Sequence, residues 1–122
     1  MTDQNKRWDG LTIKGQLEIG VWYAGMRHKE FTLRVAVAGD MVVAQQQHPE
    51  GPLQLITVEV YRRQLLSLGE IPAEALTTEL LLDELTETDL ALISDADITL
   101  EKKLKPQKAA APATGAASST PS

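Results

Sequence analysis

The chain has 122 residues, of which 12 are Lys or Arg and 17 are Asp or Glu, for a formal net charge of −5. It contains no cysteine, which excludes disulfides, thiolate nucleophiles and cysteine-ligated zinc. No apolar run approaches the roughly 20 residues of a membrane span, and residues 1–8 are too polar for a secretion signal. The sequence therefore predicts a cytoplasmic globular protein, and composition alone does not give its function.

One domain is predicted over residues 11–104, after a flexible N-terminus over residues 1–10. Residues 105–122 are rich in Ala, Pro and Ser and carry no large apolar side chain, so we expect a disordered tail. Strands are expected over about residues 11–38 and helices over about residues 40–104. The predicted fold class is α+β, with an N-terminal antiparallel hairpin or small sheet packed against about four short helices.

Alternation of apolar and polar residues predicts the strands. Apolar side chains fall on odd positions in residues 11–23 and again in residues 31–37, which is typical of strands with one buried face. Residues 24–29 between them contain a glycine and predict a hairpin loop longer than two residues. Trp22 has the opposite parity, so it either packs against a second layer or lies exposed as a contact residue.

Two helices are predicted in the middle of the chain. Gly39-Asp40 supplies an N-cap for a short helix over about residues 41–48. Residues 53–68 alternate like a strand in part and keep helical spacing in part, which leaves both assignments open. Their length and the glycine at position 69, where a helix would be followed by its C′ residue, favour the helix.

The acidic third of the chain is expected to form further short helices. A proline in the first turn suggests a helix start at residues 71–74, and Thr78 is expected to cap the next helix. Thr86 and Asp89 have the spacing of a capping box at the start of a last helix. Three consecutive leucines at positions 80–82 cannot all face one core, so at least one faces another helix or subunit.

Charge is unevenly distributed. Residues 70–101 contain ten acidic side chains and neither Lys nor Arg. Such a segment repels a phosphate backbone, which argues against nucleic-acid binding. It either forms a solvated surface that keeps the protein soluble or selects a basic partner.

No constellation of residues indicates catalysis. His28 is placed in the hairpin loop and His48 at a helix end, so both are expected at the surface. Asp95-x-Asp97 lacks the glycine and the glutamate of a calcium loop. No phosphate loop, nucleophile elbow or zinc-protease motif is present. We predict no catalytic residue, cofactor site or metal site, and do not expect an enzyme.

A series of landmarks follows a set order along residues 28–104: His28-Lys-Glu-Phe-Thr-Leu-Arg34 with Val-Ala-Val-Ala-Gly39-Asp40, then Tyr61-Arg-Arg-Gln-Leu65, Leu68-Gly69, Ile71-Pro72 and Leu76, then Leu80-Leu81, Leu85, Asp89-Leu90 and Leu100-Glu-Lys-Lys103. Their order and separation resemble those of Mu-like phage tail assembly chaperones. The resemblance implies a protein that binds the tape measure protein and keeps it soluble until the tail tube polymerises around it.

The same resemblance implies where the protein acts and with what. It is expected in the host cytoplasm and not in the mature virion. Candidate further partners are a longer, frameshifted form of the chain and the tail tube protein, whereas nucleic acid and membrane are not expected partners. The oligomeric state stays open, with a homo-oligomer among the alternatives.

Candidate contact residues follow from leucine-rich helices that offer a groove for an apolar helical stripe. They are Trp22, Tyr61, Leu80, Leu81, Leu85, Leu90 and Ile93. The main alternative is a small structural component of the tail or baseplate, which would remain in purified virions. A second is an acidic regulator that mimics nucleic acid, whose binding salt would strongly weaken.

Overall fold

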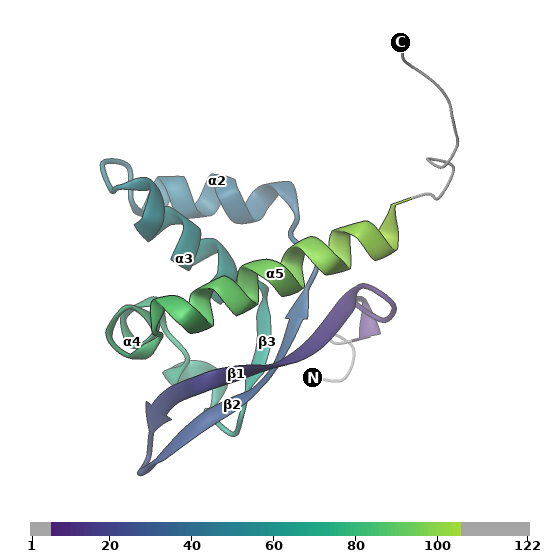
Figure 1. The fold of residues 1–122 in the computed structure, drawn as a ribbon. Helices are drawn as coiled ribbons and strands as arrows, with labels where there is room; N and C mark the ends of the chain where they lie inside the picture. The colour runs from purple at the N-terminus through teal and green to yellow at the C-terminus, as the bar shows by residue number, and fades with distance from the viewer. Residues whose placement is uncertain (1–5, 106–122) are drawn as a thin grey trace.

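The structure is a computed structural model, and it describes residues 6–105. The elements in chain order are the strands β1 (Thr12–Tyr23) and β2 (Met26–Arg34), the helices α2 (Ala38–Gln47) and α3 (Leu53–Gln64), the strand β3 (Leu65–Leu68), the short 3-10 helix η1 (Ala73–Ala75), and the helices α4 (Thr78–Glu84) and α5 (Glu87–Leu104). Figure 1 shows a small sheet accompanied by short helices, which confirms the predicted α+β fold class.

The two chain ends lie mostly outside the described part. The predictions of a flexible start and a disordered tail fall there for residues 1–5 and 106–122. Residues 7–10 form turns, in which Asp9 N–H donates to the Lys6 carbonyl and Leu11 N–H donates to the Trp8 carbonyl. The Trp8 ring lies 4.7 Å from the guanidinium of Arg34, so this segment contacts the end of β2.

The sheet has the order β1-β2-β3, and both pairings are antiparallel. β1 and β2 are joined at Ala24-Gly25, where both residues have positive φ, as a two-residue type I′ turn requires. The predicted longer loop over residues 24–29 is therefore wrong. Alanine is rarely found with positive φ, so the sequence carried no signal for this tight turn.

β2 begins earlier and ends earlier than predicted. Because it starts directly after the turn, His28 lies inside the strand, where only 5% of it is exposed, and not in a surface loop. One ring nitrogen of His28 lies 3.0 Å from the Tyr23 carbonyl oxygen, and the other accepts from the Glu70 N–H. The prediction of a surface histidine is thus corrected.

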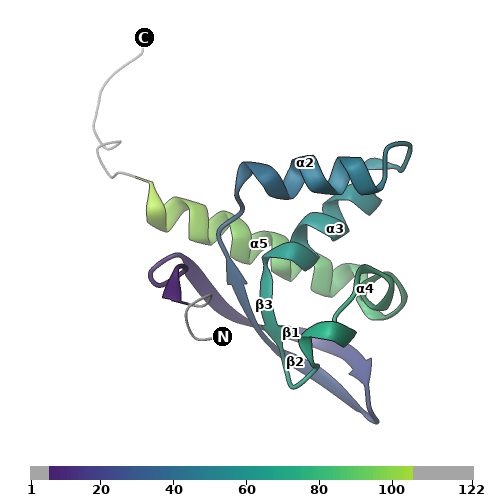
Figure 2. The same cartoon turned by 180° about the vertical axis from the view of Figure 1, so that it is seen from behind.

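β3 is the element that the sequence pattern assigned to the wrong type. The predicted helix over residues 53–68 ends at Gln64, and Leu65–Leu68 pairs with β2, with Phe31 opposite Leu68. Gly69 consequently follows a strand and not a helix. Residues 53–68 contain both alternation and helical spacing. Leu65–Leu68 becomes a strand because it pairs with the edge of β2 that β1 does not occupy (Figure 2).

Two predicted caps are displaced by one to three residues. The N-cap of α2 is Val37. Asp40 is the third residue of the helix, and its carboxylate accepts a hydrogen bond from the Val37 N–H. The N-cap of α4 is Thr77, whose hydroxyl accepts the Leu80 N–H, while Thr78 is buried. One half of the predicted capping box of α5 is confirmed, because the Thr86 hydroxyl accepts a hydrogen bond from the Asp89 N–H.

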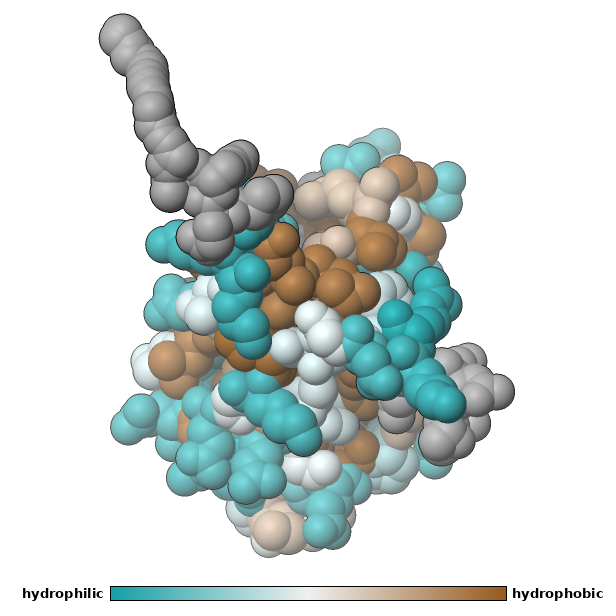
Figure 3. Space-filling model, turned by 90° about the vertical axis from the view of Figure 1, so that its right-hand side faces the viewer, coloured by the Kyte–Doolittle hydropathy of each residue, from teal (hydrophilic) through white to brown (hydrophobic). Residues whose placement is uncertain are grey.

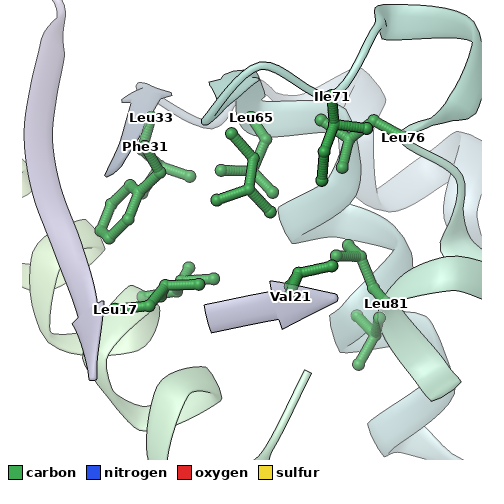
Figure 4. Packing of buried hydrophobic residues seen from close by; sticks show 11 residues of the cluster. Leu17, Val21, Phe31, Leu33, Leu65, Ile71, Leu76 and Leu81 are labelled. Carbon is green, nitrogen blue, oxygen red and sulfur yellow. The ribbon is translucent and has the colours of Figure 1, made fainter. Parts of the chain in front are cut away.

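The core lies between the sheet, α5 and the segments around α3 and α4. Its buried apolar residues are Leu17, Val21, Phe31, Leu33, Val58, Leu65, Leu68, Ile71, Leu76, Leu81 and Ile93. Figure 4 shows side chains from the strands meeting those that follow β3. α5 packs along β1 (Figure 1), and no helix within residues 6–105 is long and apolar enough to cross a membrane.

Candidate binding groove

An apolar hollow lies between α3 on one side and α4 with the start of α5 on the other. Its volume is about 330 Å³. It is lined by Pro52, Gln54, Leu55, Val58, Leu81, Leu82, Leu85, Glu87 and Leu90. Three of the predicted contact residues, Leu81, Leu85 and Leu90, therefore meet at one place.

A second hollow of about 270 Å³ lies between α3 and α5, next to the first. It shares Gln54, Glu87 and Leu90 with the first and is further lined by Thr57, Tyr61, Ala91 and Ser94. The predicted contact residue Tyr61 lies here. Because the two hollows share three residues, we treat them as one surface and name it the α3–α5 groove.

Helix phase explains which leucines face the groove. α4 begins at Thr78, and its three leucines occupy successive positions that helical geometry turns by about 100° each. Leu81 is 1% exposed and belongs to the core, whereas Leu82 is 50% exposed and lines the groove. The leucine run therefore does not face one core as a whole, as expected, and that Leu82 faces another helix or subunit stays a prediction.

A buried carboxylate outside the groove connects two of the helices that line it. Glu59 of α3 is 2% exposed and accepts hydrogen bonds from the Thr78 hydroxyl of α4 and from Arg62 at 2.7 Å. The His48 ring at the end of α2 lies 3.3 Å from the same carboxylate. Burial alone would raise the pKa of Glu59, but the Thr78, Arg62 and His48 contacts outweigh it and lower the pKa.

A second buried carboxylate fixes the start of α5 on the sheet. Asp89 is fully buried and accepts the backbone N–H groups of Glu18, Ile19 and Gly20, the shortest at 2.7 Å. These amides belong to the part of β1 where the register with β2 shifts, so β2 does not pair with them regularly. The carboxylate thereby satisfies donors of the irregular strand and positions the helix that forms one wall of the groove.

Acidic side chains of α4 and α5 lie on and beside the groove. Glu87 lines both hollows. Glu79 is exposed three residues before Leu82, and Asp95 is exposed four residues after Ala91, spacings that place each beside a lining residue on its helix. Neither hollow is lined by Lys or Arg.

The other predicted contact residues lie elsewhere. Leu80 packs against the core, and Ile93 is 0% exposed within it. Ile93 is therefore unavailable to a partner in this conformation, and Leu81 offers little surface. Trp22 is 47% exposed on β1, which rules out packing against a second layer and leaves its contact role a prediction, and its ring lies 5.6 Å from the Arg27 guanidinium. It lines neither hollow of the groove.

Sequence reasoning missed several lining residues. Leu82 was included only in the leucine run, and Leu55 and Glu87 were not considered. The i, i+3 spacing of Leu55 and Val58 was a usable signal, since it places both on one face of α3. Without the helix boundaries, nothing distinguished Leu82 from the buried Leu81.

A second apolar surface lies at the other end of the molecule. Figure 3 shows hydrophobic residues gathered on the face that carries the C-terminal end of α5 and the N-terminal end of α2. Exposed apolar residues of these elements and of the α2 N-cap are Val37, Met41, Val42, Ile98 and Leu104. The α3–α5 groove is the candidate site because it combines a hollow, a leucine lining and a defined charge.

The comparisons with known proteins give no relative: no family model matches the chain, and neither a curated protein nor a solved structure matches it significantly. Within residues 6–105, no group of three or more His, Asp or Glu side chains is placed to hold a metal ion.

Proposed function

We propose that this protein is a phage tail assembly chaperone that binds the tape measure protein in the host cytoplasm and keeps it soluble until the tail tube polymerises around it. The observation that carries the proposal is the α3–α5 groove, an apolar hollow between helices. Such grooves receive the apolar face of an amphipathic helix, whose contacts recur at i, i+3, i+4 and i+7. A long helical protein without its tube exposes stripes of this kind.

The shape of the groove suits reversible binding. Its two hollows measure about 330 and 270 Å³, at the small end of the range for ligand pockets, so each receives only a few side chains. Affinity would then be the sum of several modest contacts along a stripe. A chaperone must release its client, and complexes of this kind dissociate faster than those built on one deep pocket.

The resemblance to Mu-like tail assembly chaperones supports the proposal from the sequence. Several of its landmarks, among them Tyr61, Leu85 and Leu90, line the groove. Others, such as Leu65, Leu68 and Leu76, lie in the core and serve the fold. The landmarks therefore include residues of the core as well as residues of the surface that we propose to be functional.

The proposal is tested by co-expression with a tape measure protein, a long coiled-coil protein, from the genome that encodes this chain. We expect the partner to become soluble only in the presence of this chain, in a complex that survives high salt because apolar contacts dominate it. If the partner stays insoluble and this chain elutes alone, the proposal is wrong. Presence of the chain in purified virions would instead favour a structural tail component.

A pair of matched variants assigns the effect to the groove. Leu82→Glu places a charge on an apolar wall of the groove at a residue that is 50% exposed, and it should abolish solubilisation of the partner. Val42→Glu makes the same change at a residue of α2 that is 52% exposed and outside the groove. It should leave solubilisation unchanged. Equal effects of the two variants would refute the groove as the binding site.

A further inference from the structure

We infer that the α3–α5 groove selects a helix whose apolar stripe is flanked by Lys or Arg, so that the partner segment is a basic amphipathic helix. The inference rests on the proposed function and adds the charge of the bound segment. It explains a feature that apolar binding alone leaves unexplained, namely that the only charged residue lining the two hollows, Glu87, is acidic and stands in a segment without Lys or Arg.

The charge on and beside the groove is mainly acidic. Glu87 lines both hollows, and Glu79 and Asp95 lie one helical turn from lining residues. The basic residue at the same spacing from a lining residue, Arg62, is paired with the buried Glu59. Residues 70–101, which include all of α4 and most of α5, carry ten acidic side chains and neither Lys nor Arg. A bound helix with acidic flanks would meet like charges on this wall.

The opposite wall adds no compensating cation to the hollows. The residues of α3 that line them are uncharged, for example Gln54, Leu55 and Thr57. The nearest basic side chain of that helix in sequence, Arg62, donates to the buried Glu59 at 2.7 Å. Cationic flanks on the partner are therefore the complement of this surface, and complementary charge mainly sets specificity and association rate.

The buried and the exposed acids of the region have different roles. Glu59 and Asp89 are satisfied by hydrogen bonds inside the protein and serve the fold. Glu79, Glu87 and Asp95 are exposed, and no hydrogen bond or salt bridge of their side chains is found among the described residues. These exposed carboxylates are available to a partner.

The test uses three synthetic helical peptides of about 18 residues, or five helical turns. Two share the same leucine stripe and carry either Lys or Glu beside it, and the third has the lysines with the leucines scrambled. At about 50 mM salt we expect the Lys peptide to bind roughly tenfold or more tightly than the Glu peptide, because several exposed ion pairs add up. The preference should shrink near 500 mM salt, and the scrambled peptide should not bind.

Matched variants separate local charge from net charge. Glu79→Gln with Glu87→Gln should reduce the preference for the Lys peptide by roughly threefold or more. Glu18→Gln with Glu30→Gln removes the same charge at two exposed residues of the sheet and should leave the preference unchanged. An equal loss in both double variants would show that net charge and not the groove decides, and would overturn the inference.

Three further outcomes would overturn the charge inference. Equal binding of the Lys and Glu peptides would overturn the charge inference and leave the proposed helix binding intact. Equal binding of the scrambled peptide would show non-specific attraction and overturn it as well. If light scattering shows a dimer of the chain alone that Leu82→Glu converts to a monomer, the groove is covered by a second copy, and both this inference and the proposed partner binding at the groove are wrong.

Discussion

Two helices are attached to the molecule in different ways. α5 packs along β1, its apolar residues Ile93 and Leu100 are fully buried, and Asp89 accepts three strand amides at its start. α2 packs on α3, and Ala44 is its only fully buried apolar residue. The buried Asp40 carboxylate holds the N-terminal end of α2.

Asp40 lies between two arginines. It is 0% exposed and accepts from Arg34 at 2.8 Å and from Arg63 at 3.1 Å, so it joins the start of α2 to β2 and to α3. Burial would raise the pKa of Asp40, but the Arg34 and Val37 hydrogen bonds, the charge of Arg34 and the Arg63 hydrogen bond outweigh it and lower the pKa. The groove wall formed by α5 is thus held by apolar packing together with the Asp89 acceptor, whereas α2 buries a single apolar residue and depends mainly on the ion pairs of Asp40.

The largest effect is expected at Asp40. Asp40→Ala should reduce the free energy of unfolding by about 3–5 kcal/mol, because two arginines would lose their buried partner. Hydrogen exchange should accelerate most in α2. A loss below about 1 kcal/mol in chemical denaturation would contradict the view that this ion pair holds the helix.

A core residue of α5 gives the next effect. Ile93→Ala should destabilise the protein by about 3 kcal/mol, since it opens a cavity at a fully buried position. Ile98→Ala is the matched control on the same helix, 50% exposed, and should change stability by less than about 0.5 kcal/mol. Similar losses in both variants would mean that α5 does not pack on the sheet by the face described.

The Asp89 hydrogen bonds should contribute somewhat less. Asp89→Asn keeps the shape of the side chain but replaces one accepting oxygen with a donor that faces strand amides. We expect a loss of about 2 kcal/mol in the free energy of unfolding. Urea denaturation measures it, and an unchanged midpoint would show that β1 does not need this acceptor.

The pH dependence separates the two regions most finely. Asp40 and Glu59 both have lowered pKa values in the folded state, so their stabilisation is complete above the unfolded carboxyl pKa of about 4 and is lost as the pH falls through the folded values. Stability should therefore be flat between about pH 7 and 5 and decrease below about pH 4. The Asp40→Asn, Glu59→Gln double variant should show a shallower decrease, and an identical slope would contradict this assignment.

The sequence predicted the parts of the fold that follow local rules. Alternation located β1, and the threonine at position 86 located the start of α5. It mistook Leu65–Leu68 for helix because that segment becomes a strand only by pairing with β2, a contact of residues more than 30 positions apart. His28 was misplaced because the turn at Ala24-Gly25 uses an unusual alanine conformation.

The candidate site was predictable in composition more than in detail. Leucines at positions 81, 85 and 90 were expected to lie together, and they do. Ile93 was assigned to the surface because periodicity gives a face of α5 but not which neighbour covers it. The roles of Asp89 and Glu59 depend on partners distant in sequence, so no spacing rule could have indicated them.

A helical partner in the α3–α5 groove should change hydrogen exchange where the groove is lined, and we would measure it on the complex with the tape measure protein. We expect slower exchange in α4 and in the first turns of α5, with the Trp22–Arg27 end of the hairpin unchanged. Protection confined to the hairpin or to α2, with α4 unaffected, would show that the partner binds elsewhere.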